Sequence, residues 1–230
     1  MRFLILVVSF MASMCFAEKP AMVYDHLDDS FFVDGYDFYV PTDADIVMER
    51  RKCHGGGHGG SCALMGVWFI YGVEGVLEKN AMMSVEYHTK SCNSNDAKWA
   101  ESCLEVANAY RYGDLFWKGL SHDIFKAFDF DRKACSLRLD LCGNLASDYL
   151  YGRGVRQDSN KAIELYGQSC GVGSGADCYL AGNVYAKGEG VPRNEKEALE
   201  FYGKACDNRY VSGCEAYAEL KQILMQRFSR

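Results

Sequence analysis

Residues 142–170 read CGNLASDYLYGRGVRQDSNKAIELYGQSC, and the pattern returns at residues 178–206 as CYLAGNVYAKGEGVPRNEKEALEFYGKAC. The two segments align without a gap, and each cysteine lies 36 residues before its equivalent. A period of this length is typical of solenoids built from helix-turn-helix repeats. We therefore expect stacked helix pairs, with two diverged copies at residues 62–92 and 103–135 bringing the array to about four pairs.

Each unit divides into two helices at a glycine turn. In the last unit, the apolar spacing over residues 178–187 predicts a first helix, which Gly188 to Gly190 ends because glycine tolerates positive φ. Asn194, three residues before Glu197, is typical of an N-cap and predicts the start of the second helix. Asp158 has the same place one unit earlier. A terminal helix is predicted over residues 211–228, and small residues should let neighbouring helices approach closely: Ala146, Ala162, Gly182 and Ala198.

Ten cysteines recur with the repeat. They form five neighbouring sets, each with one member ending a second helix and the other beginning the next first helix: Cys53 and Cys62, Cys92 and Cys103, Cys135 and Cys142, Cys170 and Cys178, Cys206 and Cys214. A disulfide needs Cα atoms about 4.4–6.8 Å apart, which facing positions at a short helix connection can satisfy. Equivalent cysteines of successive units are further apart. No set has the short spacing that zinc sites favour, so we predict disulfides and no structural metal.

The repeat resembles a known family. The pattern formed by Tyr149, Gly152, Gly154-Val155, Lys161-Ala162 and Tyr166 before Cys170 is similar to the Sel1-like repeat, a relative of the tetratricopeptide repeat. The paired cysteines resemble those of the Helicobacter cysteine-rich proteins. This resemblance implies an all-α, right-handed α-solenoid stapled by disulfides within the array.

The amino-terminal residues predict export. Arg2 is followed by an apolar run to Phe16 and by Ala17, which is typical of a signal peptide over residues 1–17. Cys15 falls in that segment, so the remaining cysteines are even in number, as in an oxidising compartment. We expect a secreted or periplasmic protein without a membrane span after cleavage. The net charge of −6 and the scattered basic residues argue against nucleic-acid binding.

Residues 18–45 show no repeat pattern, and we assign the repeat domain to residues 46–230. The segment mixes many aspartates with aromatic residues such as Phe31, Phe32 and Tyr36. We favour a cap over the first helices, as terminal units of solenoids require. The alternative is an arm that occupies or recruits a binding surface.

Two motifs offer chemistry, and a structural interpretation is favoured for both. His54 and His58 lie in a glycine tract between Cys53 and Cys62, where they could bind a metal weakly, but the further ligands of a closed site are missing. Residues 167–171 fit G-x-S-x-G around Ser169. A nucleophile elbow follows a strand, whereas this match ends a repeat helix, so we interpret it as chance.

These observations favour a binding scaffold for a protein or an extended peptide on the concave face. Polar residues expected on the first helices are candidates for gripping the peptide: Asn108, Asn144, Asp148 and Asn183. We predict no catalytic residue and no cofactor. The alternative, implied by the Helicobacter resemblance, is a weak β-lactamase or a protein that binds penicillin or cell-wall fragments, although S-x-x-K, S-D-N and K-T-G are absent.

Overall fold

The computed structural model describes residues 41–56, 58–73, 75–115 and 117–228. These residues form α-helices with three short 3-10 helices and no strand beyond an isolated bridge between Val73 and Leu77. The α-helices are α1 (Asp43–Gly56), α2 (Gly59–Tyr71), α3 (Ala81–Cys92), α4 (Glu101–Tyr112), α5 (Ile124–Leu137), α6 (Gly143–Tyr151), α7 (Ser159–Gly171), α8 (Gly175–Lys187), α9 (Glu195–Asp207) and α10 (Val211–Phe228). The predicted terminal helix over residues 211–228 is confirmed.

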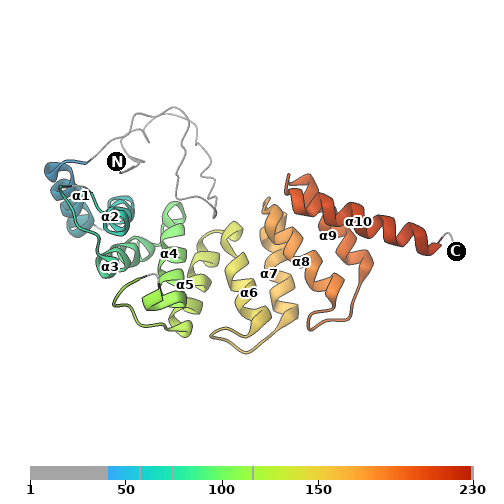
Figure 1. Cartoon of the computed structure of the whole chain (residues 1–230). Helices are drawn as coiled ribbons and strands as arrows, with labels where there is room; N and C mark the ends of the chain where they lie inside the picture. Colours follow the sequence, from blue (N-terminus) through green and yellow to red (C-terminus); the bar gives the residue numbers. More distant parts are fainter. Residues whose placement is uncertain (1–40, 57, 74, 116, 229–230) are drawn as a thin grey trace, which may run out of the picture.

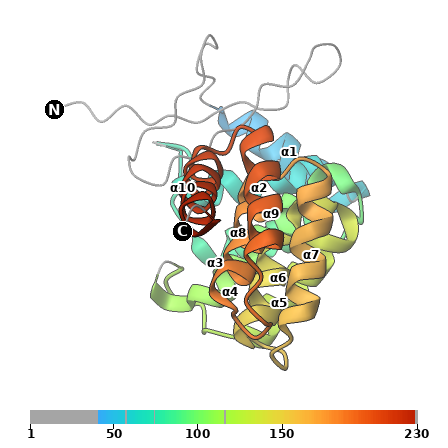
Figure 2. The same ribbon diagram turned by 90° about the vertical axis from the view of Figure 1, so that its right-hand side faces the viewer.

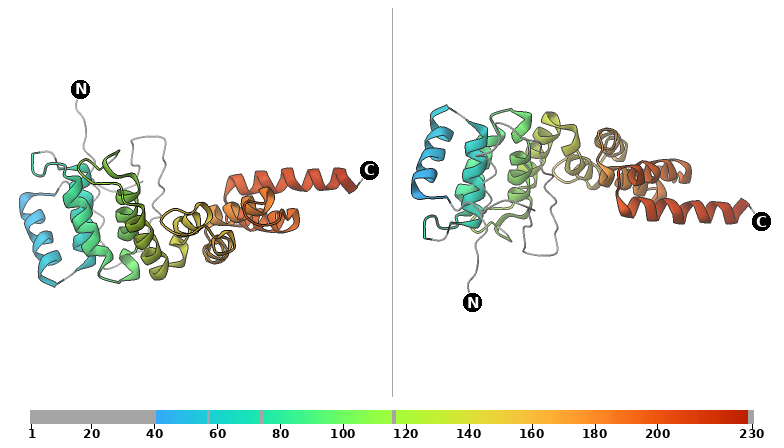
Figure 3. Two further views of the ribbon diagram at one scale, coloured as in Figure 1. Left: turned by 90° about the horizontal axis from the view of Figure 1, so that it is seen from below. Right: turned by 90° about the horizontal axis from the view of Figure 1, so that it is seen from above.

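The helices stack in chain order into a solenoid. Each helix packs against the next one in the chain, so α1 and α10 lie at opposite ends (Figure 1). Views from below and from above show the same order (Figure 3), and a view from the α10 end looks along the stack (Figure 2). We call α2, α4, α6 and α8 the first helices and α3, α5, α7 and α9 the second helices. The predicted all-α solenoid is confirmed.

An Asn or Asp side chain begins every second helix. Asp158 Oδ1 accepts from the Lys161 backbone N–H at 3.0 Å, and Asn194 Oδ1 accepts from the N–H groups of Lys196 and Glu197. Asn80 and Asp123 cap α3 and α5 in the same way. Each cap satisfies an N–H group that has no partner within the helix and stabilises it by about 1 kcal/mol. The two predicted caps are confirmed.

Glycine ends the first helices where the backbone turns. Gly152 and Gly188 have φ values of 70° and 73°, in the left-handed region that side chains with a Cβ disfavour. The chain then crosses in a short loop and enters the second helix. This turn fixes the length of each first helix.

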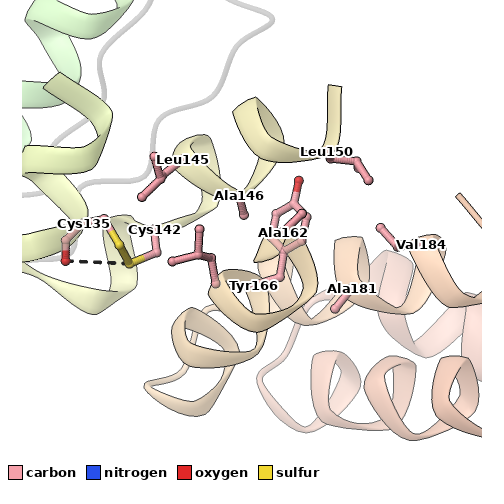
Figure 4. Close-up of a cluster of buried hydrophobic side chains, with 10 residues drawn as sticks. Cys135, Cys142, Leu145, Ala146, Leu150, Ala162, Tyr166, Ala181 and Val184 are labelled. Carbon is pink, nitrogen blue, oxygen red and sulfur yellow. Dashed lines mark hydrogen bonds between the residues drawn. A yellow bond between two sulfur atoms is a disulfide. The ribbon is translucent and has the colours of Figure 1, made fainter. Parts of the chain in front are cut away.

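The core is continuous from one unit to the next. Figure 4 shows side chains of α6, α7 and α8 meeting in one buried cluster, with the disulfide of Cys135 and Cys142 at one side. Tyr166 is 1% exposed, and its hydroxyl is 2.6 Å from Ser147 Oγ. Because α8 belongs to the next unit, each unit completes its core only when its neighbour is present.

Small residues allow this close packing. Ala146, Ala162 and Ala198 are fully buried, and a Cβ atom placed on Gly182 would lie 2.6 Å from the Tyr202 ring. No side chain larger than hydrogen fits at position 182 unless the Tyr202 ring on α9 shifts. The predicted close approach is confirmed.

Five disulfides fasten successive helices. Cα–Cα distances of 4.4–4.9 Å join the same neighbouring cysteines that the sequence analysis paired. Each bridge links the end of one helix to the start of the next across 7 to 11 residues. In the chain-entropy account, a closed loop of this size stabilises the fold by about 2–3 kcal/mol.

The amino-terminal helix begins before the repeat domain that we assigned. Thr42 and Asp45 cap α1 reciprocally, with the Thr42 N–H donating to Asp45 Oδ2 at 2.9 Å and the Asp45 N–H to Thr42 Oγ1 at 3.3 Å. Asp43 and Asp45 therefore form the first turn of α1. The predicted signal peptide and residues 18–40 lie outside the described residues.

Candidate binding face of the first helices

Each first helix presents one stripe of side chains that its neighbours leave at least partly exposed. The stripe lies two, five and nine residues after the cysteine near the start of that helix, positions that share one side of a helix. Because the units repeat in register, the four stripes occupy equivalent positions on successive first helices, and we call the set the first-helix face. Its residues are Leu64, Val67, Tyr71, Glu105, Asn108, Tyr112, Asn144, Ser147, Tyr151, Leu180, Asn183 and Lys187.

A row of tyrosines follows one edge of this face. Tyr71, Tyr112 and Tyr151 each precede the glycine that ends their helix and are 37%, 47% and 60% exposed. On α8, the equivalent position is occupied by Lys187. The guanidinium of Arg153 lies over the Tyr151 ring, with its carbon 5.5 Å from the ring centroid. Sequence reasoning missed this row, although a Tyr-Gly pair ends three successive first helices in the printed sequence.

The middle row is polar in three of its four positions, and hydrogen bonds hold its two amides in place. Tyr202 on α9 donates its hydroxyl to Asn183 Oδ1 at 2.7 Å, and Arg111 donates to Asn108 Oδ1 at 3.0 Å. Both amides thus have their carbonyl oxygen engaged, so their chemistry toward a ligand is to donate N–H groups. A peptide carbonyl is a suitable acceptor for such groups.

The four predicted binding residues do not share one environment. Asn108, Asn144 and Asn183 are half-buried members of the first-helix face. Asp148 is fully buried, and its carboxylate accepts from Arg111 at 3.2 Å and from Arg153 at 3.0 Å. Its side chain is therefore engaged within the protein, while the binding role of the three asparagines stays a prediction.

A buried charged cluster lies behind the face where the second and third units meet. Arg111 on α4 reaches both Asp131 on α5 and Asp148 on α6, and each carboxylate is fully buried. Burial raises the pKa of Asp131 to about 7, and the charge of Asp148 adds to this while Arg111 opposes it. The cluster couples two neighbouring units through one guanidinium.

Two hollows lie at the opposite, cysteine-bearing end of the first units. His58 lines one of about 610 Å³ together with Lys52 and Trp99, and His54 lines the other of about 400 Å³. His54 Nε2 lies 3.3 Å from Lys90 Nζ. Among the described residues, no group of three or more His, Cys, Asp or Glu side chains is placed to hold a metal ion.

Most of the glycine tract around these histidines belongs to the two helices that it joins. α1 runs to Gly56 and α2 begins at Gly59, so only residues 57 and 58 connect them. A Cβ atom on Gly59 would lie 2.6 Å from both Ser94 Oγ and the Trp99 ring. The glycines therefore serve close helix packing as well as the turn.

Ser169 has a structural environment. It is fully buried at the end of α7, and its hydroxyl donates to Asp177 Oδ2 at 2.5 Å. Burial raises the pKa of Asp177, and the hydrogen bonds from Ser169 and Ser174 oppose that shift.

Within the described part of the chain, no helix is long and apolar enough to span a bilayer.

Comparisons with known proteins identify the repeat. A family model described as Sel1 repeat matches residues 60–96, 100–138, 142–173 and 175–210, which together make up more than half of the chain. The matched segments coincide with the four helix pairs and confirm the resemblance that the sequence motifs indicated.

Individual relatives extend the comparison. Cytochrome c oxidase assembly factor 7A of Xenopus laevis is 30% identical over 118 residues, 50% of this chain and 48% of that protein, so the chain spans about half the length of this curated relative. A protective antigen of uropathogenic Escherichia coli with an SLR fold superposes with a TM-score of 0.67 at 21% identity, over 79% of this chain and 37% of the antigen. Helicobacter pylori cysteine rich protein B is 26% identical over 59% of this chain and 92% of its own, with a TM-score of 0.43.

Proposed function

The chain belongs to the Sel1 repeat family, and from this premise we propose that it is a scaffold that binds an extended peptide or protein segment on the first-helix face. Sel1 repeats generally mediate protein interactions. The observation that carries the proposal is the register of the face. The second and third units each place an amide or hydroxyl beside an exposed tyrosine, and the first and fourth units keep one half of this pattern, in Tyr71 and Asn183. An extended peptide also presents its side chains and backbone groups at regular intervals.

The chemistry of the face suits a peptide. Tyrosine offers a large, rigid contact surface with a polar tip, and aromatic residues are enriched at protein interfaces. Asn108 and Asn183 can donate to backbone carbonyl groups of an extended segment. The half-buried Leu64 and Val67 and the exposed Leu180 add apolar area.

Five disulfides suit an oxidising compartment, because reducing systems keep cytosolic thiols reduced. They point to a protein that is not cytoplasmic. We propose that it acts in the periplasm or outside the cell, with the cysteine bridges holding the face in a fixed shape.

Affinity capture with the oxidised protein tests this function. The variant Tyr71→Ser, Tyr112→Ser, Tyr151→Ser should lose the partner that the natural protein retains from an extract of its source. The matched control is Val172→Ser, Val211→Ser, Met225→Ser, since these residues are 53–69% exposed and lie outside the face. Equal retention by the tyrosine variant, with circular dichroism unchanged, would refute the proposed face.

A further inference from the structure

The amino-terminal segment begins its path at the tyrosine edge of the array. α1 packs against α2 and is bridged to it at their cysteine-bearing ends. Because the two helices are antiparallel, the start of α1 lies near the end of α2, and Ile46 shares a buried cluster with Phe69 and Val73. The residues that precede α1 therefore join the fold on the same edge as Tyr71.

The composition of that segment complements the row of tyrosines. Residues 18–40 carry six acidic side chains against one lysine, together with six aromatic residues: Tyr24, Phe31, Phe32, Tyr36, Phe38 and Tyr39. Aromatic pairs contribute about 0.5–1.5 kcal/mol beyond their buried area, and tyrosine hydroxyl groups donate to carboxylates. Such a segment can make both contacts with the exposed rings of Tyr112 and Tyr151.

Basic side chains lie beside the far end of the row. Arg153 covers Tyr151, Arg156 is exposed in the following loop, and Lys187 continues the row on α8 with 64% of its side chain exposed. Some neighbouring charge is already balanced, since Lys187 lies 3.4 Å from Glu189 and Arg153 pairs with Asp148. Arg156 and the outer part of Lys187 give the third and fourth units an attraction for carboxylates.

The length of the segment is sufficient. An extended chain spans about 3.3 Å per residue, so residues 18–40 reach roughly 75 Å. Packed helices are about 8–10 Å apart, so the six steps from α2 to α8 need no more than roughly 60 Å. The segment can reach every tyrosine of the row from its attachment at α1.

We propose that residues 18–40 occupy the first-helix face of their own chain and compete there with the external partner. The proposal rests on the proposed function in one respect, namely that this face binds extended peptides. Of the two sequence-based interpretations of this segment, the proposal favours an arm that occupies a binding surface over a cap on the first helices. It also assigns the partner a chemical character, an extended segment with acidic and aromatic side chains that displaces the chain's own.

Photo-cross-linking in the full chain tests the contact. The photoreactive residue p-benzoylphenylalanine replaces Tyr112 in one variant, Tyr151 in a second, and Val172, an exposed residue at the opposite end of the helix pairs, in a control. Irradiation and peptide mapping should link the Tyr112 and Tyr151 positions to residues 18–40. The Val172 position should give no such link, and replacing Asp25, Asp28, Asp29, Asp34 and Asp37 by Asn should lower the yield severalfold.

Isotope mixing separates a contact within one chain from a contact between copies. In an equal mixture of ¹⁴N and ¹⁵N protein, the linked peptides should carry one isotope only. Links between isotopes, equal linking from Val172, or no link from either tyrosine position in folded variants would each overturn the proposal. If partner capture depends on the tyrosines but no internal cross-link forms, the proposed contact of residues 18–40 is refuted and the binding function stands. If the internal cross-link forms but capture does not depend on the tyrosines, the contact stands and the proposed binding function is refuted.

Discussion

The hydroxyl of Ser169 donates to Asp177, and these residues directly precede the two cysteines of the bridge between Cys170 and Cys178. The same positions meet at another bridge, where Ser102 donates to Ser91 at 2.9 Å next to Cys92 and Cys103. At the last bridge, a Cβ atom on Gly213 would lie 2.4 Å from Ala205 Cβ. At these three bridges, the residues that precede the paired cysteines contact each other at the helix connection, which gives Ser169 a structural role.

Replacing Ser169 by Ala should lower the free energy of unfolding by about 1 kcal/mol, the usual contribution of such a hydrogen bond. Asp177 keeps the hydrogen bond from Ser174, which moderates the loss. Ser136→Ala is the matched control, because its exposed hydroxyl donates only to the nearby Lys133 carbonyl. Urea unfolding measures both variants, and equal stability would show that the bond to Asp177 contributes nothing.

Two glycine substitutions should change stability in opposite directions. Gly182→Ala places a Cβ atom 2.6 Å from the Tyr202 ring and should cost about 1–3 kcal/mol through overpacking. A Cβ atom added at Gly167 would have no neighbouring atom within 4 Å. Gly167→Ala should therefore raise the free energy of unfolding by roughly 0.5–1 kcal/mol, because alanine favours the helix. Thermal unfolding of the pair decides. Similar shifts for both would contradict the packing of α8 against α9.

The pKa of Asp131, raised to about 7 from 3.8, makes stability depend on pH. Folding takes up a proton at this group between about pH 4 and pH 7, so its contribution to stability falls as pH rises through that window. Relative to the natural protein, Asp131→Asn should therefore become more stable as pH rises from about 5 to about 8. Asp129→Asn is the control, since that side chain is 62% exposed. A stability difference independent of pH would rule out this titration.

Removing one disulfide should loosen the array locally. Cys170→Ala with Cys178→Ala should lower the unfolding free energy by about 2–3 kcal/mol, because the unfolded chain gains the entropy of an open loop. Peptide mapping without reduction should find these two cysteines joined in the natural protein. A dominant bridge between units, or an unchanged melting temperature in the double variant, would contradict the stapling role.

The repeat and its turns could be predicted because they depend on local chemistry. Asn194 caps a helix and Gly188 ends one for reasons that act within a few residues. Asp148 shows where this reasoning stops, because its partner Arg111 lies 37 residues away in the previous unit. The sequence near Asp148 gave no sign that its carboxylate would be buried and paired with a guanidinium from another helix. The tyrosine row could have been predicted from the sequence, because the regularly spaced cysteines give the register of the units.

Fluorine NMR of 3-fluorotyrosine protein tests the binding face most directly. Single Tyr→Phe variants assign the resonances, and the partner retained by capture is then added. The resonances of Tyr71, Tyr112 and Tyr151 should shift together, while those of the buried Tyr87 and Tyr166 stay in place. If the partner binds and these three resonances do not move, the first-helix face is not its binding site.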